Sequence, residues 1–409
     1  MNGISLIVAT RSLLRNRRRS ISALSAIIFG VIALLIASGF IDWIYLDMRE
    51  STIQSRLGHI QVMKPGYLTR GFSDPFDFLL PEHSPILDAL DKIPGVQVVT
   101  PRLFFGGLIS HGDATLSFLG EGVQPVTETS VSLRLRLVAG AGFSSTDSKE
   151  VILGEGLAKS LGVMINDTVV LLATTAAGGM NAAELRVKGI FQTSTKGYDD
   201  MALRVPLGVA HGLLRASGVH KWVVLLDKTE NTDKVLRDLR SRFPEATSGV
   251  HFVPWYEQAD FYNKTVRLFS KQVRIVWFLI AVVIVLSISN TLIMSVLERT
   301  REIGTLLALG FRRAQVLRQF IVEGVVLGLV GGTIGLVTGM LLARLISIIG
   351  IPMPPPPGMA VGFIGQVTVS WPLAGEVLLF ALVISMAASI YPAWRASRLE
   401  IVDALRHNR

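Results

Sequence analysis

The chain has 409 residues, of which 50% are hydrophobic and only 17% are charged. This balance is too apolar for a water-soluble protein of this length, so some segments must lie in lipid. The formal net charge is +9, but the basic residues gather where apolar segments end, which indicates membrane topology rather than nucleic-acid binding. The sequence contains no cysteine, so a domain outside the membrane must be stabilised without disulfides.

The N-terminal segment, residues 1–20, combines apolar side chains with arginines. This pattern predicts an amphipathic helix on the cytoplasmic face of the membrane, and a plain topological anchor explains the same residues equally well. Residues 21–41 form the first predicted transmembrane helix, because their apolar run matches the roughly 20 residues that cross a bilayer. A cleaved signal peptide is the weaker interpretation, since its core is only about 7–15 residues long and no A-x-A cleavage site follows.

Residues 42–271 indicate a large extracytoplasmic α+β domain. Short apolar runs bounded by turn residues predict strands, as at 95–101 and 114–120, and helical patterns lie between them. A final helix is predicted to begin near Tyr256 and to continue into the membrane as a stalk, because no Pro or Gly occurs before Leu297.

Three further apolar segments are predicted to cross the membrane, at residues 272–297, 320–345 and 372–392. The loop at 298–319 and the tail at 393–409 are rich in arginine, whereas the Pro-rich hairpin at 346–371 has no Lys or Arg. The positive-inside rule therefore places both termini and the loop in the cytoplasm, and the large domain and the hairpin outside.

Small residues at four-residue spacing predict helix faces that a neighbouring backbone can approach closely. They occur on the first and third membrane segments, and the predicted packing residues are Ala26, Gly30, Gly324, Gly328, Gly331, Gly332, Gly335 and Gly339. Two arrangements fit these faces: contact between two chains through the first two helices, or packing inside one chain.

The sequence holds none of the motifs that mark common catalytic sites. It has no G-x-x-x-x-G-K-[ST] loop for nucleotide phosphates, no H-E-x-x-H and no G-x-S-x-G. Its seven histidines are scattered, which argues against a metal site because zinc needs three or four ligands close together. No charged side chain lies at the centre of a predicted span, which argues against ion or proton transport. We therefore expect no catalytic residue, no metal and no cofactor on this chain.

The loop at 298–319 has the pattern of a docking element for a soluble partner. Charged residues flank a short helical stretch with an apolar patch, and a glycine follows it. The residues assigned to this interface are Glu298, Arg299, Arg301, Glu302, Ile303, Gly304, Leu306, Leu307, Gly310, Arg312 and Arg313. The patch itself is expected to expose Ile303, Leu306, Leu307 and Leu309. A re-entrant connector lying against lipid is the alternative interpretation.

The same loop resembles the FtsX/MacB superfamily of ABC transporter permeases, whose pattern is E-R-x-x-E-I-G-x-x-x-A-x-G. The N-terminal segment at 11–19 is similar to the family's R-N-L-L-R-N-R-R-R. The C-terminal segment at 391–406 is similar to the family's Y-P-A-x-x-A-x-x-x-x-P-x-x-A-L-R ending, although Ile401 stands where proline is usual. Residues 151–167 resemble the periplasmic core domain of MacB-like and lipoprotein-releasing LolC/LolE-type permeases.

The resemblance implies a multi-pass permease of the bacterial inner membrane, assembled as a homodimer or heterodimer with two copies of a separate ABC ATPase. That partner would bind ATP and Mg²⁺, and the loop would be its coupling helix. The implied cargo is an amphiphile, with lipoprotein release ahead of export of drugs, peptides or lipids. Further implied contacts are membrane lipids and a periplasmic adaptor or lipoprotein carrier. A non-transporting, FtsX-type signal relay is the alternative of a different class.

Overall fold

The computed structural model describes residues 17–71, 73–82, 84–131, 135–193, 195–355 and 362–398. Most of the expected N-terminal amphipathic helix, residues 1–16, and the end of the tail, residues 399–409, lie outside the described residues. The chain divides into two compact units. The helical unit contains Met1–Tyr45, Thr265–Pro352 and Ile364–Arg409, and the sheet unit contains Leu46–Lys264 and Met353–Phe363.

In the described part of the chain, four helices are long and apolar enough to cross a membrane, which confirms the predicted number. They are α2, Arg17–Thr52; α12, Asp260–Glu298; α14, Arg313–Ile349; and α15, Trp371–Ser397. Each is longer than the membrane segment assigned to it from hydropathy alone. A helix does begin near Tyr256, namely α11, Trp255–Gln258, but its predicted continuity with the membrane helix is wrong, because a non-helical Ala259 (φ −85°, ψ 55°) separates it from α12.

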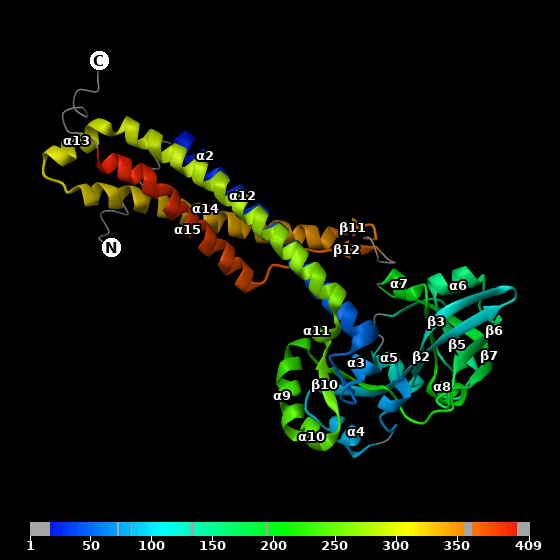
Figure 1. Cartoon of the computed structure of the whole chain (residues 1–409). Coiled ribbons are helices and arrows are strands. Elements are labelled where there is room, and N and C mark those ends of the chain that lie inside the picture. The colour runs from blue at the N-terminus through cyan, green and yellow to red at the C-terminus, as the bar shows by residue number, and fades with distance from the viewer. Residues whose placement is uncertain are drawn as a thin grey trace. The chain divides into compact units, whose positions relative to one another are not determined.

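The four helices run side by side (Figure 1). Their shared core is formed by apolar side chains from α2, α12, α14 and α15, including Ile27, Ile284, Leu327 and Val377, each fully or almost fully buried. Polar contacts add to this packing where the helices approach. Trp277 Nε1 donates a 3.0 Å hydrogen bond to Ser38 Oγ, which joins α12 to α2.

The connection between α14 and α15 contains two short paired strands, β11, Ile351–Met353, and β12, Phe363–Gly365. Residues 356–361, which hold part of the expected Pro-rich run, lie outside the described residues. An extended stretch then leads to α15, and the Thr368 N–H donates a 3.1 Å hydrogen bond to the carbonyl oxygen of Gly39. This bond gives an otherwise exposed backbone donor a partner within the bundle.

The sheet unit is built on one ten-stranded sheet, in the order β10-β1-β9-β2-β3-β8-β5-β7-β4, with β6 between β2 and β7. The strands are β1, Ile60–Met63; β2, Val96–His111; β3, Ala114–Val123; β4, Arg136–Gly140; β5, Glu150–Gly154; β6, Thr168–Thr174; β7, Met180–Gln192; β8, Ala202–Pro206; β9, Lys221–Leu226; and β10, His251–Pro254. Two of the pairings, β3 with β8 and β5 with β7, are parallel.

Strand β2 divides the sheet unit into two parts. Its first half pairs with β9, and its second half pairs with both β3 and β6. Because β6 also pairs with β7, the strands β2, β3, β8, β5, β7 and β6 form a closed ring. Closure leaves no free edges inside the ring, where an open sheet would expose unpaired backbone groups.

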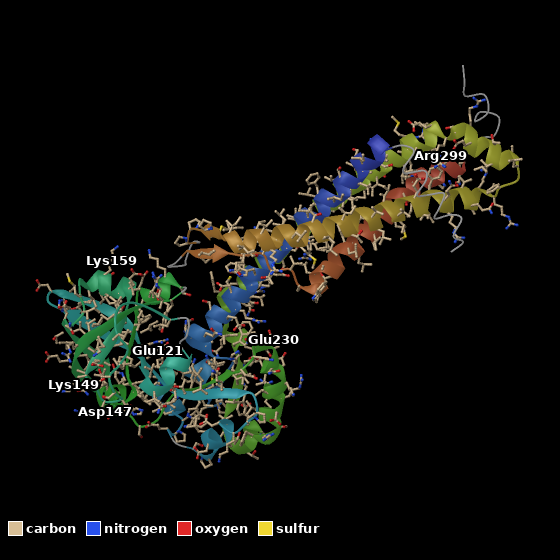
Figure 2. All side chains as sticks on the ribbon, turned by 180° about the vertical axis from the view of Figure 1, so that it is seen from behind. Glu121, Asp147, Lys149, Lys159, Glu230 and Arg299 are labelled. Carbon is tan, nitrogen blue, oxygen red and sulfur yellow. The ribbon has the colours of Figure 1, made fainter. Side chains whose placement is uncertain are left out.

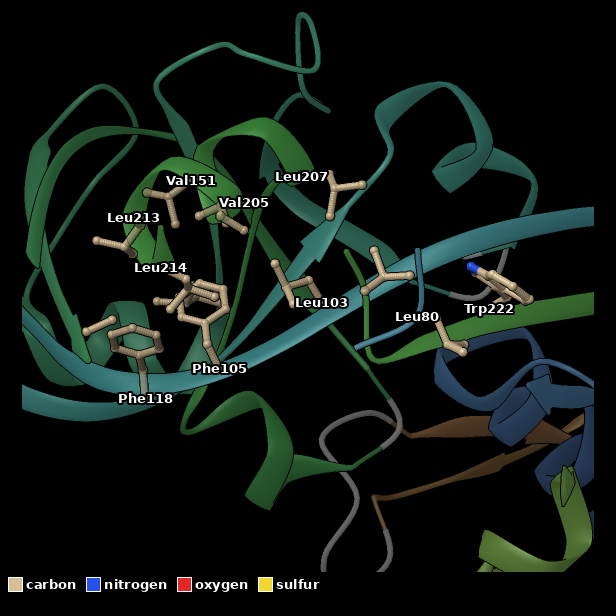
Figure 3. Packing of buried hydrophobic residues seen from close by; sticks show 14 of the residues in the cluster. Leu80, Leu103, Phe105, Phe118, Val151, Val205, Leu207, Leu213, Leu214 and Trp222 are labelled. Carbon is tan, nitrogen blue, oxygen red and sulfur yellow. The ribbon is translucent and has the colours of Figure 1, made fainter. Parts of the chain in front are cut away.

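Short helices cover these strands. The α-helices are α3, Tyr67–Arg70; α4, Pro85–Leu90; α5, Pro125–Val131; α6, Glu155–Leu161; α7, Lys196–Asp199; α8, Leu207–Leu214; α9, Thr232–Arg242; and α10, Glu245–Ser248. Three further turns are η1, Ile53–Leu57; η2, Pro75–Phe78; and η3, Thr229–Asn231. Figure 3 shows the core beneath them, where Leu103, Phe105 and Phe118 of the ring pack near Leu213 and Leu214 of α8. The expected α+β domain is confirmed.

Candidate functional site

The segment between the second and third long helices forms a short helix at one end of the bundle (Figure 1). Helix α13, Thr300–Ala308, is separated from α12 by the single residue Arg299. The Thr300 hydroxyl donates to the carbonyl oxygens of Val296 and Leu297, at 3.0 and 2.9 Å. It thereby gives partners to carbonyls that the end of α12 would leave free.

A glycine turn ends α13. Gly310 has a φ of +95°, a left-handed conformation that residues with a side chain rarely adopt. The Gly310 N–H donates to the Leu307 carbonyl and the Phe311 N–H to the Leu306 carbonyl, both at 3.1 Å. These two bonds form a Schellman motif, so Gly310 ends the helix as the sequence predicted.

The apolar patch of this segment differs from the expected one. Ile303 is only 4% exposed and belongs to the bundle core, and Leu307, one turn later, packs against the same core. Leu306 is half-buried, whereas Leu309 and Phe311 are 75% and 48% exposed. The exposed apolar surface therefore lies at the turn after α13, because the i, i+4 pair of the helix faces the bundle.

The charged residues of the segment divide into two groups. Arg301, Arg312 and Arg313 are exposed, as are Glu298 and Glu302. The Arg299 side chain, in contrast, is only 13% exposed, and Figure 2 labels it at this end of the bundle. We call the exposed residues of the turn, Leu309, Gly310, Phe311, Arg312 and Arg313, together with Arg301, the docking surface.

The predicted packing glycines contact neighbouring helices of the same chain. On α14, Gly324 and Gly328 face α15, where an added Cβ would lie 2.5 and 2.7 Å from the Cβ atoms of Ser389 and Ser385. Added Cβ atoms elsewhere on α14 would meet Ile27, Val31 and Leu35 of α2 or Leu378 of α15, at positions Gly331, Gly335, Gly339 and Gly332. Backbone approach of this kind needs residues without side chains.

The first helix uses its small residues in the same way. A Cβ on Gly30 would lie 3.1 and 3.2 Å from side-chain atoms of Ile280 and Ile284 on α12, while Ala26 is half-buried. The sequence left open whether this helix packs against a second chain or inside one chain. Gly30 packs against α12 of the same chain.

Sequence reasoning missed a buried charge network in the sheet unit. Arg102 of β2 lies 2.8 Å from Glu128, and Arg204 of β8 lies 3.3 Å from Glu121 of β3, with both arginine side chains at most 3% exposed. Tyr198 Oη donates a 2.7 Å hydrogen bond to Glu121. Burial raises the pKa of Glu121, but Arg204 and Arg102 oppose it and the net pKa is lowered. Arg102 and Glu121 directly follow the predicted strands at 95–101 and 114–120, and nothing in their sequence neighbourhood indicated that they would be buried together.

Among the described residues, no group of three or more His, Asp or Glu side chains has a geometry that could hold a metal ion.

Two family profiles match the chain. The profile described as "MacB-like periplasmic core domain" matches residues 20–242, which is more than half of the sequence. The profile described as "FtsX-like permease C-terminal" matches residues 274–401, which include α13, α14, α15 and the part of α12 from residue 274 onward. The chain belongs to the FtsX/MacB superfamily of ABC transporter permeases.

Known relatives of this permease include transporters of different kinds. The lipoprotein-releasing system transmembrane protein LolC of Xylella fastidiosa strain 9a5c is 24% identical over 99% of both chains. LolE of Haemophilus influenzae is 25% identical over 77% of this permease and 79% of that protein. The macrolide export ATP-binding/permease protein MacB of Sodalis glossinidius is 33% identical, but over only 35% of this permease and 20% of that protein.

Among solved structures, the periplasmic region of MacB from Actinobacillus actinomycetemcomitans is similar at 16% sequence identity, with a TM-score of 0.38. It covers 53% of this permease and 95% of the solved chain.

Proposed function

We propose that this permease couples ATP hydrolysis by a separate ATPase to the release of lipoproteins from the bacterial inner membrane. The observation that carries the proposal is the 24% identity to a LolC protein along 99% of both chains. The similarity to a MacB protein covers only 20% of that protein, whose name includes an ATP-binding part. This permease has no G-x-x-x-x-G-K-[ST] motif for nucleotide phosphates, so its ATPase is assigned to another chain.

The docking surface is the proposed contact with the ATPase. Its arginines belong to the cytoplasmic loop under the positive-inside rule, which puts both termini on the same side and the sheet unit in the periplasm. Exposed apolar side chains beside charged ones are typical of protein interaction sites. Leu309 and Phe311 supply the apolar part, and Arg301, Arg312 and Arg313 surround it with positive charge.

Energetics favour the apolar part as the coupling element. Shifting a two-state element from mostly one form to mostly the other takes about 5.5 kcal/mol of differential binding. An exposed ion pair contributes about 0–1 kcal/mol, whereas burying one large apolar side chain contributes about 1.5–3 kcal/mol. Leu309 and Phe311 together therefore supply more of this free energy than any single arginine of the docking surface.

Substitution of Leu309 tests the docking assignment. We expect Leu309→Asp to abolish co-purification of the ATPase and the response of its hydrolysis rate to the permease. Met164→Asp is the matched control, because Met164 is also 75% exposed but lies in the sheet unit. Retention of the ATPase by Leu309→Asp would contradict the assignment. Leu307→Asp is unsuitable, because Leu307 packs against the bundle core and the variant would destabilise the fold.

Reconstitution tests the cargo. The permease and its co-expressed ATPase are placed in proteoliposomes that contain a fluorescent triacylated lipoprotein. A lipoprotein carrier is added outside, and the fluorescence of the lipoprotein released into the soluble fraction is measured. We expect ATP-dependent transfer of the acylated form and stimulation of hydrolysis by that form alone. Hydrolysis without any transfer would instead favour a signal relay, and transfer of a macrolide or free lipid in place of the lipoprotein would favour MacB-type export.

A further inference from the structure

One guanidinium contacts two helices, α13 and α14, at the end of the bundle. Arg299 lies between α12 and α13, and its Nε is 3.2 Å from Glu302 Oε2 in the first turn of α13. Its Nη1 is 3.6 Å from Glu323 Oε2 on α14. The guanidinium carbon also lies 6.0 Å from the ring centroid of Phe320, one turn before Glu323. Arg299 therefore contacts the helix it precedes and the helix beyond the turn.

The carboxylate of Glu323 gives this contact its strength. Its side chain is only 4% exposed and lies on a helix that enters the membrane, where an ionised carboxylate without a counter-charge is costly. Removing one partner of a buried ion pair leaves the other charge uncompensated, which is strongly destabilising. The arrangement in which Arg299 reaches Glu323 is therefore favoured over others in which α13 points elsewhere.

The backbone changes direction at Arg299. Arg299 has φ −103° and ψ 14°, outside the regular helix, so α12 and α13 do not form one continuous rod. The Arg299 N–H still donates 3.2 Å hydrogen bonds to the carbonyl oxygens of Ser295 and Val296 in α12, but these bonds do not reach α14. Side-chain contacts then add to what holds α13 against α14. Ile303 anchors the helix through the core, and the Arg299–Glu323 pair adds an interaction that depends on distance and charge.

We infer that Arg299 is a positioning residue that holds α13 against α14 through Glu323, and so orients the docking surface without belonging to it. This role differs from the one predicted by the sequence, which assigned Arg299 to the ATPase-coupling interface itself. The effect on hydrolysis rests on the proposed function, whereas the effect on the direction of α13 does not.

The permease has no cysteine, so pairs of spin labels can be introduced without removing native residues. Thr305 of α13 and Arg318 of α14 are both exposed and suit the Thr305→Cys and Arg318→Cys labelling pair. We expect a narrow distance distribution in the otherwise unchanged full chain. Arg299→Gln and Glu323→Gln should each broaden it, and the exchange Arg299→Glu with Glu323→Arg should narrow it again.

Arg301→Gln is the matched control, because Arg301 is exposed two residues away and should leave the distribution unchanged. An unchanged distribution in Glu323→Gln, which preserves side-chain size, would overturn the inference even if Arg299→Gln failed to fold. Failure of the exchanged pair to narrow the distribution would also overturn it, since a merely steric role would not respond to exchange of the charges.

Hydrolysis measurements separate this inference from the docking assignment. With the co-expressed ATPase, Arg299→Gln should retain the partner but lose most of the hydrolysis response, about tenfold, and the exchanged pair should recover it. A full response in Arg299→Gln would overturn the inference while leaving docking intact. Retention of the ATPase by Leu309→Asp would instead contradict docking, and the spin-label result would still decide the role of Arg299.

Discussion

Arg204 Nη2 donates a 3.1 Å hydrogen bond to the carbonyl oxygen of Ser55. Ser55 lies in η1, the π-helical turn that directly follows α2, and Arg204 lies in β8 of the sheet unit. The same guanidinium is paired with Glu121 and Glu128. A single side chain thus joins the turn at the end of α2 to the carboxylates buried beside the closed ring of strands.

Arg204→Met should therefore destabilise the sheet unit strongly. The substitution leaves buried carboxylates with less positive charge nearby and removes the partner of the Ser55 carbonyl, so we expect the free energy of unfolding to fall by about 3–5 kcal/mol. Denaturation of the full-length protein in detergent measures this. Arg186→Met, at an exposed position of β7, is the control and should change stability by about 0.5 kcal/mol or less. Equal effects of the two variants would contradict the role of the network.

Acidification should destabilise the sheet unit in a window set by two histidines. Burial lowers the pKa of both His59 and His220 to about 4. Their Nδ1 atoms accept 3.0 Å hydrogen bonds from the N–H groups of Leu226 and Phe104, which only an unprotonated nitrogen can do. Because the folded pKa lies below the unfolded value of about 6.5, their contribution is complete above pH 6.5 and is lost as pH falls towards 4.

At pH 4, each histidine should lower the free energy of unfolding by about 3 kcal/mol, because its pKa is about 4 in the folded state and about 6.5 in the unfolded state. Unfolding midpoints measured between pH 7 and pH 5 avoid the range in which Glu150 titrates, since hydrogen bonds from Ser144 and Ser148 overcome its burial and lower its pKa to about 2. His220→Asn retains an acceptor for the Phe104 N–H and should flatten the pH slope. An unaltered slope in this variant would contradict the assignment.

Two glycines of α14, Gly324 and Gly328, lie so close to α15 that a side chain at either position should weaken the packing of the two helices. Gly324→Ala and Gly328→Ala would each place a Cβ within 2.7 Å of a serine Cβ on α15, so the helices must separate, at a cost of about 1–3 kcal/mol. Gly375→Ala is the matched control on α15, because no atom lies within 4 Å of its added Cβ. Denaturation by SDS should show lower stability for the first two variants only. Equal midpoints for all three would contradict close packing.

One feature of the α13 segment could be anticipated from the sequence because it depends on local backbone chemistry. Gly310 was expected to end α13, and its positive φ is a property of glycine in that position. The exposed patch could not be anticipated in the same way. Ile303, Leu307 and Leu309 are all large apolar residues, so the sequence does not distinguish them. Packing against the long helices of the bundle decides which of them is buried.

By itself, the sequence determined four apolar helices, an α+β domain and the family, because membrane length, turn residues and the E-R-x-x-E-I-G pattern are all local along the chain. The tertiary structure alone decided the closed ring of strands, the burial of Arg102 and Arg204, and the pairing of Arg299 with Glu323. These features join residues far apart or on different helices, and the free energy of burying a charge depends on those neighbours rather than on the residue itself.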